Sequence, residues 1–326
     1  MKLSTTKKLA AAAAATALLL TSACGSGDDG GDGGLTQVTV GILPTVDLAP
    51  LQYAIDEGLF EEHGLEVTTR VTSGGAEAIP ALMAGDVDFI FTSYIPVLLA
   101  RQADLDVVIA SGSHSNTPGE ASPSGVWVSG DSPAQSLADL EGATIAVNSL
   151  GSVAELLVVA AMDSIGVGRD DFDLLEIPFP DVPAALDQGR VDATWVAEPS
   201  RSTIIKNLSA RFVGSPDDPA VLSAAAELQD VPMAGYAARG SEDAGLLEAF
   251  HSAMDEALGV LADDPGIARE LAPEYTEIDA ELLPDLAVST FGPVEAADLE
   301  RLQDLMVTYG LLDEPLEDID EIVYQP

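Results

Sequence analysis

Two stretches rich in glycine and serine have the residue types that bind small molecules through backbone amides. Ser73-Gly74-Gly75-Ala76 and Asn148-Ser149-Leu150-Gly151-Ser152 each follow a short apolar run and precede a run with helical spacing. A helix that begins with small or capping residues leaves its first N–H groups without partners inside the helix. These groups and the positive end of the helix dipole suit an anion such as a carboxylate, sulfonate or nitrate. Ordinary helix caps have the same composition, so it is the occurrence of two such stretches that favours a binding site.

The elements that position these stretches alternate along the chain. Residues 37–43, 65–71 and 87–93 are short apolar runs that predict strands, and apolar residues over 48–59 fall on one helical face. Alternating strands and helices predict parallel strands with helices on both faces of a sheet. The expected fold class is therefore α/β.

A repeated pattern indicates that the chain builds this arrangement twice. Residues 81–93 and 185–197 both contain A-L-x-x-G-x-V-D. In each copy we expect glycine to end a helix with positive φ, valine to enter a buried strand, and aspartate to hydrogen-bond near the turn. The repeat predicts two similar α/β lobes whose strand tips reach a shared ligand cleft.

Breaker-rich segments mark where the chain passes between the lobes. Residues 112–125 hold so many serines, glycines and prolines that we interpret them as a loop, the first crossing. A second α/β run follows, then a loose segment over 215–230 and a returning strand over 233–240. From residue 241 onward the periodicity predicts a mostly helical chain.

The candidate site residues follow from these predicted strand tips. In open parallel sheets, ligands bind at the carboxyl ends of the strands. The residues so identified as ligand-binding are Thr45, Asp47, Gly74, Gly75, Ala76, Thr92, Tyr94, His114, Asn148, Gly151, Ser152, Trp195 and Glu198.

Several of these residues have a second interpretation that the sequence leaves open. Trp195 and Tyr94 form either an apolar wall or part of the core, and Glu198 either binds solute or favours the start of the following helix. His114 lies in the predicted crossing loop, where it can reach a solute.

Basic residues are scarce near the predicted cleft. Arg101 and Arg201 are the nearest in sequence, and we expect both to point to solvent from helices. This favours a neutral, zwitterionic or heteroaromatic solute, although backbone donors alone can hold an organic anion.

Composition excludes some classes of function. The chain has 326 residues, 47% of them hydrophobic, and a formal net charge of −42 with the acids dispersed along it. Nucleic-acid binding is excluded because phosphates need a basic footprint. The sequence has no H-x-x-x-H spacing, Gly-x-Ser-x-Gly elbow or phosphate loop, so we expect no catalytic residue, metal or cofactor.

The first residues are typical of export. Residues 1–23 combine three lysines, an apolar run and a small-residue cleavage region, which predicts a signal peptide too short to span a bilayer. Cys24 follows at once, in a setting that resembles a bacterial lipobox, with Thr21 where an aliphatic residue is usual. We expect lipidation of Cys24, a flexible tether over 24–34, and anchoring to the outer face of the cell membrane.

Two motifs carry a resemblance to a known family. The block L-x-x-A-x-x-x-G-L-F-x-x-x-G-L-x-V over 51–67 and S-L-A-D-L-E-G over 136–142 resemble the nitrate/sulfonate/taurine-type solute-binding proteins of ABC importers. The resemblance covers most of residues 37–261. It implies a bilobal periplasmic-binding-protein fold of type II, with hinge strands joining lobe 1 (residues 35–123 plus 232–326) to lobe 2 (residues 124–231).

The resemblance implies a function as well. The chain would bind a small solute between closing lobes and deliver it to an ABC permease, without enzymatic turnover. Two alternatives stay open: an enzyme of pyrimidine or thiamine-precursor metabolism on the same fold, since some relatives act on such compounds, and an extracellular sensor subunit.

Overall fold

The computed structural model describes residues 34–115, 124–214 and 231–326. The predicted signal peptide, Cys24 and all of the tether except Gly34 lie outside the described residues. Residues 116–123 and 215–230, where we expect the chain to cross between lobes, also lie outside them. The structural statements below concern the described residues.

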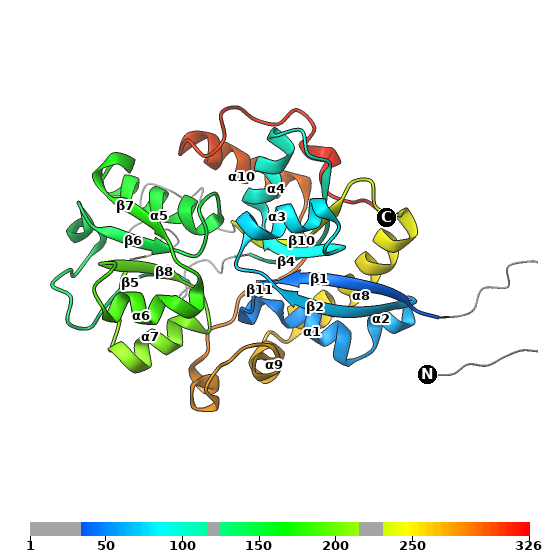
Figure 1. The fold of residues 1–326 in the computed structure, drawn as a ribbon, viewed down its shortest axis with the longest axis horizontal. Coiled ribbons are helices and arrows are strands. Elements are labelled where there is room, and N and C mark those ends of the chain that lie inside the picture. The colour runs from blue at the N-terminus through cyan, green and yellow to red at the C-terminus, as the bar shows by residue number, and fades with distance from the viewer. Residues whose placement is uncertain (1–33, 116–123, 215–230) are drawn as a thin grey trace, which may run out of the picture. The chain divides into compact units, whose positions relative to one another are not determined.

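The first sheet is built by the first and last parts of the described chain (Figure 1). Its order is β11-β4-β10-β3-β1-β2, in which β1, β2 and β3 run parallel, whereas β10 is antiparallel to β3 and β4, and β11 is antiparallel to β4. Its strands are β1 (Thr36–Ile42), β2 (Leu65–Val71), β3 (Phe89–Ser93), β4 (Val107–Ser115), β10 (Pro232–Arg239) and β11 (Thr290–Phe291).

Helices cover both faces of the first sheet. In Figure 1, α3, α4 and α10 lie on one face, and α1, α2, α8 and α9 lie on the other. Phe250 of α8 stacks on Phe89 of β3 with ring centroids 3.8 Å apart, which anchors the long helix to the sheet. The helices are α1 (Ala49–Asp56), α2 (Leu59–Glu62), α3 (Gly75–Ala84), α4 (Tyr94–Gln102), α8 (Ala244–Asp263), α9 (Ile267–Tyr275) and α10 (Ala296–Thr308).

The second sheet uses only the middle of the chain. Its order is β7-β6-β8-β5-β9, with β7, β6 and β8 parallel and β5 antiparallel to both β8 and β9. Helix α5 lies on one face, and α6 and α7 lie on the other (Figure 1). The elements are β5 (Gly125–Val128), β6 (Thr144–Val147), α5 (Val153–Ser164), β7 (Asp173–Glu176), α6 (Val182–Asp187), β8 (Ala193–Val196), α7 (Ser200–Leu208) and β9 (Arg211–Gly214). Helix α5 is apolar almost all round and is correspondingly buried.

Short 3-10 helices complete the described chain. They span Val46–Leu48, Leu137–Leu140, Arg169–Asp171, Phe179–Asp181, Ala280–Asp285 and Ile319–Glu321. Two of them, Val46–Leu48 and Phe179–Asp181, follow strands at the edge where the two sheets approach each other, so they bring side chains to the site described below.

The α/β class is confirmed, but the expectation of parallel strands is wrong for β5 and β10. A parallel neighbour requires a crossover, usually a helix, between the two strands. No helix of the described chain connects β4 to β5 or β9 to β10, because the chain changes sheets there. The predicted loop over 112–125 is also shorter than expected: Ser115 pairs with Pro232 and Thr290, which extends β4.

The repeated sequence pattern builds the same local structure in both sheets. Gly85 follows the last residue of α3 and has a φ of 76°. Gly189 lies in the turn after α6 and has a φ of 65°. Asp88 Oδ2 accepts a hydrogen bond from Thr39 N (2.8 Å), and Asp192 Oδ2 accepts one from Thr144 N (2.9 Å). Each aspartate therefore ties the entry of one strand to the backbone of the neighbouring strand.

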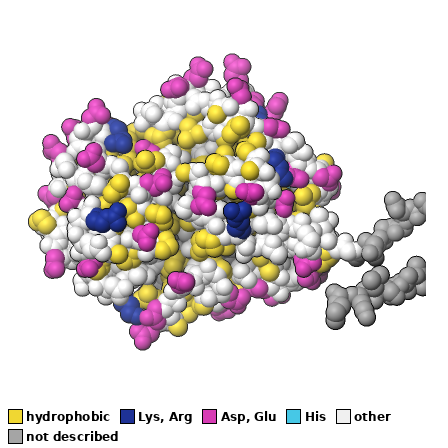
Figure 2. All heavy atoms as spheres, viewed as in Figure 1, with side chains coloured by type: hydrophobic (Ala, Val, Ile, Leu, Met, Phe, Trp, Pro, Cys, Tyr) yellow, Lys and Arg dark blue, Asp and Glu magenta, His cyan; other side chains and the backbone are white. Residues whose placement is uncertain are grey.

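The surface carries its acids in a scattered pattern. On the face drawn in Figure 2, acidic side chains lie apart from one another over every region, and few lysines or arginines accompany them. No helix of the described residues has the length and apolar character needed to cross a membrane.

Candidate functional site

A hollow between the two sheets brings together residues from both. Its empty space is about 710 Å³, a volume that includes space open to solvent. Nine of the predicted site residues line it: Thr45, Asp47, Gly74, Gly75, Thr92, His114, Asn148, Ser152 and Trp195.

Four predicted site residues do not line the hollow. Tyr94 is 2% exposed, and its hydroxyl lies beneath Gly235 in the core of the first sheet. Gly151 lines a separate depression beside Leu99, and Ala76 is exposed on α3. Glu198 is buried beside the hollow in a hydrogen-bond network of its own.

Sequence reasoning missed several lining residues. They are Leu43, Phe91, Ser124, Val153, Phe179, Met233, Ala234 and Ser289, whereas Ser93 and Ala197 belong to predicted strand tips, although they were not among the selected site residues. Met233 and Ala234 lie near the amino end of β10, which is antiparallel to β3 and β4, so this end lies beside the carboxyl ends of both neighbours. If the strand that returns to the first sheet had been predicted as antiparallel, both residues would have been placed at the site.

The two glycine- and serine-rich helix starts face each other closely. A Cβ atom at Gly74 would lie 3.1 Å from Ser149 Cβ and 3.3 Å from Asn148 Nδ2. A Cβ atom at Gly75 would lie 2.2 Å from Pro96 Cγ, so α3 also packs tightly on α4. Glycine at these positions is what allows the start of α3 to approach both α4 and the second sheet.

Acidic side chains occupy the surroundings of both helix starts. Glu77 Oε2 accepts hydrogen bonds of 2.8 Å from Ser73 N and Ser73 Oγ, and these bonds lower the pKa of Glu77. Glu155 Oε2 accepts from Gly151 N (2.7 Å), and Glu176 Oε2 accepts from Leu150 N (2.9 Å). Three backbone N–H groups near these helix starts are therefore already bonded to carboxylates of the chain itself, which offset part of the positive potential there.

A carboxylate and a histidine lie together on the first-sheet side of the hollow. Ser289 Oγ donates a hydrogen bond of 2.6 Å to Asp47 Oδ1, and His114 Nε2 lies 3.6 Å from Asp47 Oδ2. Burial lowers the pKa of His114, and the nearby Asp47 opposes this shift only partly. The imidazole is accordingly neutral at pH 7. His114 belongs to β4, not to the crossing loop in which the sequence placed it.

Four buried polar atoms in the wall of the hollow lack a hydrogen-bond partner among the described residues. They are Thr45 Oγ1, Thr92 Oγ1, His114 Nδ1 and Trp195 Nε1. A buried polar group without a partner costs about 1–3 kcal/mol, so such groups are usually satisfied by water or a ligand. Their shared position around one space makes them donors and acceptors available to a solute.

The two arginines nearest in sequence do not point to solvent, contrary to expectation. The Arg101 side chain is 16% exposed and pairs with Asp318, and the Arg201 side chain is 15% exposed and pairs with Glu198. Arg201 also lies over the Trp127 ring, 5.1 Å from its centroid. Acidic and aromatic neighbours hold both side chains against the protein, and no lysine or arginine is among the described residues that line the hollow.

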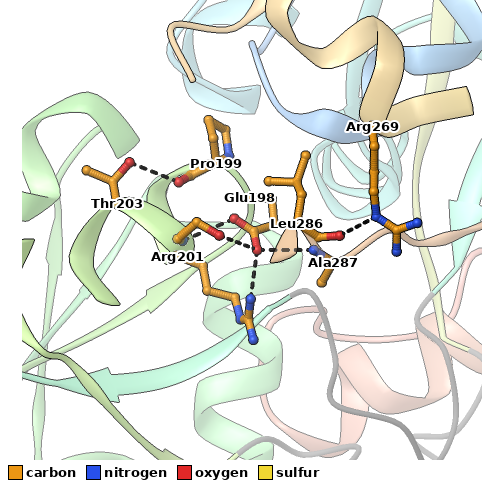
Figure 3. A network of polar contacts seen from close by, with 8 residues as sticks. Glu198, Pro199, Arg201, Thr203, Arg269, Leu286 and Ala287 are labelled. Atoms are coloured by element: carbon orange, nitrogen blue, oxygen red, sulfur yellow. Dashed lines mark hydrogen bonds and ion pairs between the residues drawn. The ribbon is translucent and has the colours of Figure 1, made fainter. Parts of the chain in front are cut away.

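Glu198 joins the end of the second sheet to segments of the first (Figure 3). Its carboxylate accepts hydrogen bonds from Arg201 Nη1 (2.8 Å), from Ser202 N (3.1 Å) and from Ala287 N (3.4 Å). Its carbonyl oxygen accepts one from Val46 N at 3.3 Å. The bond from Ser202 N favours the interpretation that Glu198 supports the start of α7, and the bonds from Ala287 and Val46 add a link between the sheets.

The lowered pKa of His114 predicts a pH dependence of stability. Below pH 6.5, the ordinary value, the unfolded chain takes up a proton that the folded chain does not, so the free energy of unfolding falls as pH falls. We expect up to about 1.4 kcal/mol per pH unit from this one residue. Urea unfolding at pH 7, 6 and 5 measures it. His114→Gln should reduce the slope between pH 6.5 and 5, and an unchanged slope would contradict the prediction.

No group of three or more histidine, cysteine, aspartate or glutamate side chains within residues 34–115, 124–214 and 231–326 has the arrangement of a metal site. The described residues that line the hollow provide hydrogen-bonding groups, the Asp47 carboxylate and apolar side chains.

Comparison with known proteins extends these observations. Residues 31–209, more than half of the chain, match the NMT1-like family. A Brucella abortus (strain 2308) protein named as a binding protein is 23% identical over 286 residues, which cover 82% of this chain and 83% of that protein.

Two solved structures have a similar fold. The alkanesulfonate-binding protein of Xanthomonas axonopodis pv. citri, bound to MOPS, has a TM-score of 0.69 and 19% identity, covering 89% of this chain and 99% of that chain. The periplasmic nitrate-binding protein of Synechocystis PCC 6803 has a TM-score of 0.69 and 14% identity, covering 89% and 86%. They confirm the bilobal periplasmic-binding-protein fold and the resemblance to nitrate- and sulfonate-type binding proteins. The match over residues 31–209 shows that the chain belongs to the NMT1-like family.

Proposed function

We propose that this chain is a solute receptor that works outside the cytoplasm, captures a small molecule between two closing lobes and delivers it to an ABC permease. The observation that carries the proposal is the hollow, whose wall combines residues of both sheets with four buried polar atoms that lack partners. A solute bound there would hold the two sheets together, as hinge closure around a ligand requires.

The lobes of this proposal are residues 35–123 plus 232–326 and residues 124–231. The strands support this division, because β1 to β4 with β10 and β11 form one sheet and β5 to β9 form the other.

A receptor without turnover is favoured over an enzyme of pyrimidine or thiamine-precursor metabolism. The support is that the similar proteins named above are binding proteins. No comparable observation favours the extracellular sensor subunit. A sensor would differ from the importer receptor in its membrane partner and not in its binding site.

The receptor function is tested by a thermal-shift panel of sulfonates, nitrate, pyrimidines, flavins, amino acids and amines. A solute at about 100 times its dissociation constant should stabilise the folded protein by about 2.7 kcal/mol. We expect one class of solute to do so and to be recovered unchanged. Chemical conversion of the stabilising solute would instead support the enzyme.

The proposed lipid anchor at Cys24 has a separate test. Cys24→Ala should release the protein from the membrane into the medium, because the acyl chains that hold it there cannot be attached. Ser26→Ala, two residues further along, is the control and should stay with the membrane. Membrane fractionation followed by immunoblotting distinguishes the two variants, and continued membrane retention of Cys24→Ala would rule out the anchor.

A further inference from the structure

We propose that the solute is an organic cation, whose positively charged nitrogen lies beside Asp47 and whose apolar or aromatic body lies against Phe179 and Trp195. The proposal rests on the receptor function and names the chemical class that its site selects. Neither the match to the NMT1-like family nor the two similar structures determines this class, because the charge of the solute depends on the residues of this chain's own hollow.

The first argument is that the buried Asp47 carboxylate has no lysine or arginine partner among the described residues. Asp47 is 8% exposed, and Ser113 Oγ fixes its position by donating to its backbone carbonyl oxygen (3.1 Å). The carboxylate has one short hydrogen bond, from Ser289, and no lysine or arginine lines the described part of the hollow. Buried charges are normally paired, so a positive group is missing at this point.

The second argument is that His114 does not supply that charge. Its Nε2 lies 3.6 Å from Asp47 Oδ2, which is too far for a hydrogen bond, and burial lowers its pKa. With a neutral imidazole, His114 provides no positive charge beside the Asp47 carboxylate. A protonated amine of the solute is the remaining partner.

The third argument comes from the aromatic side chains. Phe179 and Trp195 have ring centroids 6.3 Å apart and planes inclined by 27°, and both line the hollow. Phe91 and His114 form a second ring pair, with centroids 6.2 Å apart. Aromatic faces attract cations through the ring quadrupole and also pack on apolar groups, so these walls suit a cation with an apolar body.

The fourth argument concerns the helix starts, which on sequence alone favour an anion. Glu77, Glu155 and Glu176 accept hydrogen bonds from backbone N–H groups at or just before the starts of α3 and α5. An anion in the hollow would meet Asp47 directly, without one basic side chain in the described wall. The negative potential of the whole chain, with 55 acids against 13 bases, acts in the same direction.

The test compares benzylamine, benzyl alcohol and benzoate, which share one ring and differ in the charge of the group attached to it. Calorimetric titration should show benzylamine, as its cation at pH 7, binding about tenfold to a hundredfold more tightly than benzyl alcohol, with no binding of benzoate. Asp47→Asn should remove the preference for benzylamine and leave the affinity for benzyl alcohol nearly unchanged. Asp263→Asn makes the same charge change at an exposed position, the last residue of α8, which does not line the hollow, and should behave like the unmodified protein.

The possible outcomes separate this inference from the receptor function. Tighter binding of benzoate than of benzylamine would overturn the cation assignment and leave a solute receptor in place. Equal behaviour of the three probes, including no binding of any, would also overturn it, because Asp47 would then not select by charge. Preference for benzylamine that survives Asp47→Asn would place the recognising charge elsewhere.

Discussion

Replacing Glu198 with alanine is expected to lower the free energy of unfolding by about 3–5 kcal/mol, since it leaves a largely buried cation without its partner. Glu198 is 1% exposed and the Arg201 side chain is 15% exposed. The change also removes the acceptor for Ser202 N and Ala287 N, so α7 loses support at its first turn and the two sheets lose a link.

Glu242→Ala provides the matched control for this prediction. Glu242 forms an ion pair with Arg239 at the same sequence spacing, but both residues belong to the part of the chain that builds the first sheet. Chemical unfolding should show a loss for both variants, and small-angle scattering should show a more open average shape for Glu198→Ala only. Equal scattering curves for the two variants would contradict the role of Glu198 in joining the sheets.

Replacing Gly74 with valine is expected to weaken solute binding by about 5-fold to 150-fold. A Cβ atom at this position already lies 3.1 Å from Ser149 Cβ, and the further methyl groups of valine would hold α3 away from the second sheet. Overpacking of this kind costs about 1–3 kcal/mol, and in the proposed receptor this cost falls on the form in which the two helix starts meet.

Gly85→Ala separates this effect from backbone strain. Gly74 has φ of +146° and Gly85 has φ of +76°, so both substitutions strain the backbone. A Cβ atom at Gly85 meets nothing within 4 Å. Both variants should lose stability, whereas calorimetric titration with the stabilising solute should show weaker binding for Gly74→Val only. Unchanged affinity of Gly74→Val would mean that the two helix starts do not approach each other when solute binds.

The sequence predicts those site residues whose position follows from strand direction. Thr92 lies at the carboxyl end of β3 and Asn148 directly after β6, which are parallel strands, and the carboxyl-end rule places both in the hollow. Gly74 and Gly75 are predictable for a related reason, because a helix that begins at a strand tip needs small residues there.

The remaining site residues depend on contacts between distant segments, which no local pattern encodes. Ser289 reaches Asp47 from a segment 242 residues further along the chain, and Met233 comes from an antiparallel strand. Tyr94 follows its strand tip as expected, yet its side chain turns into the core, because Gly235 leaves space for the ring. Side-chain direction at a helix start is set by packing, and the sequence alone does not determine it.

The link through Glu198 lies close to the solute side chains. Val46, which donates to the Glu198 carbonyl oxygen, stands between Thr45 and Asp47, and both of these line the hollow. Tyr275 in turn donates a hydrogen bond of 2.9 Å to the Val46 carbonyl oxygen. Movement of the 3-10 turn at Val46 would therefore alter both the solute contacts and the contact between the sheets.

The central claim is that a solute binds between the two sheets. A crystal structure of the protein grown with the solute that stabilises it most tests this directly. We predict density in the hollow, in contact with Asp47 and Thr92 from the first sheet side and with Asn148 and Trp195 from the second. Solute bound elsewhere on the molecule, with this hollow filled only by water, would contradict the account.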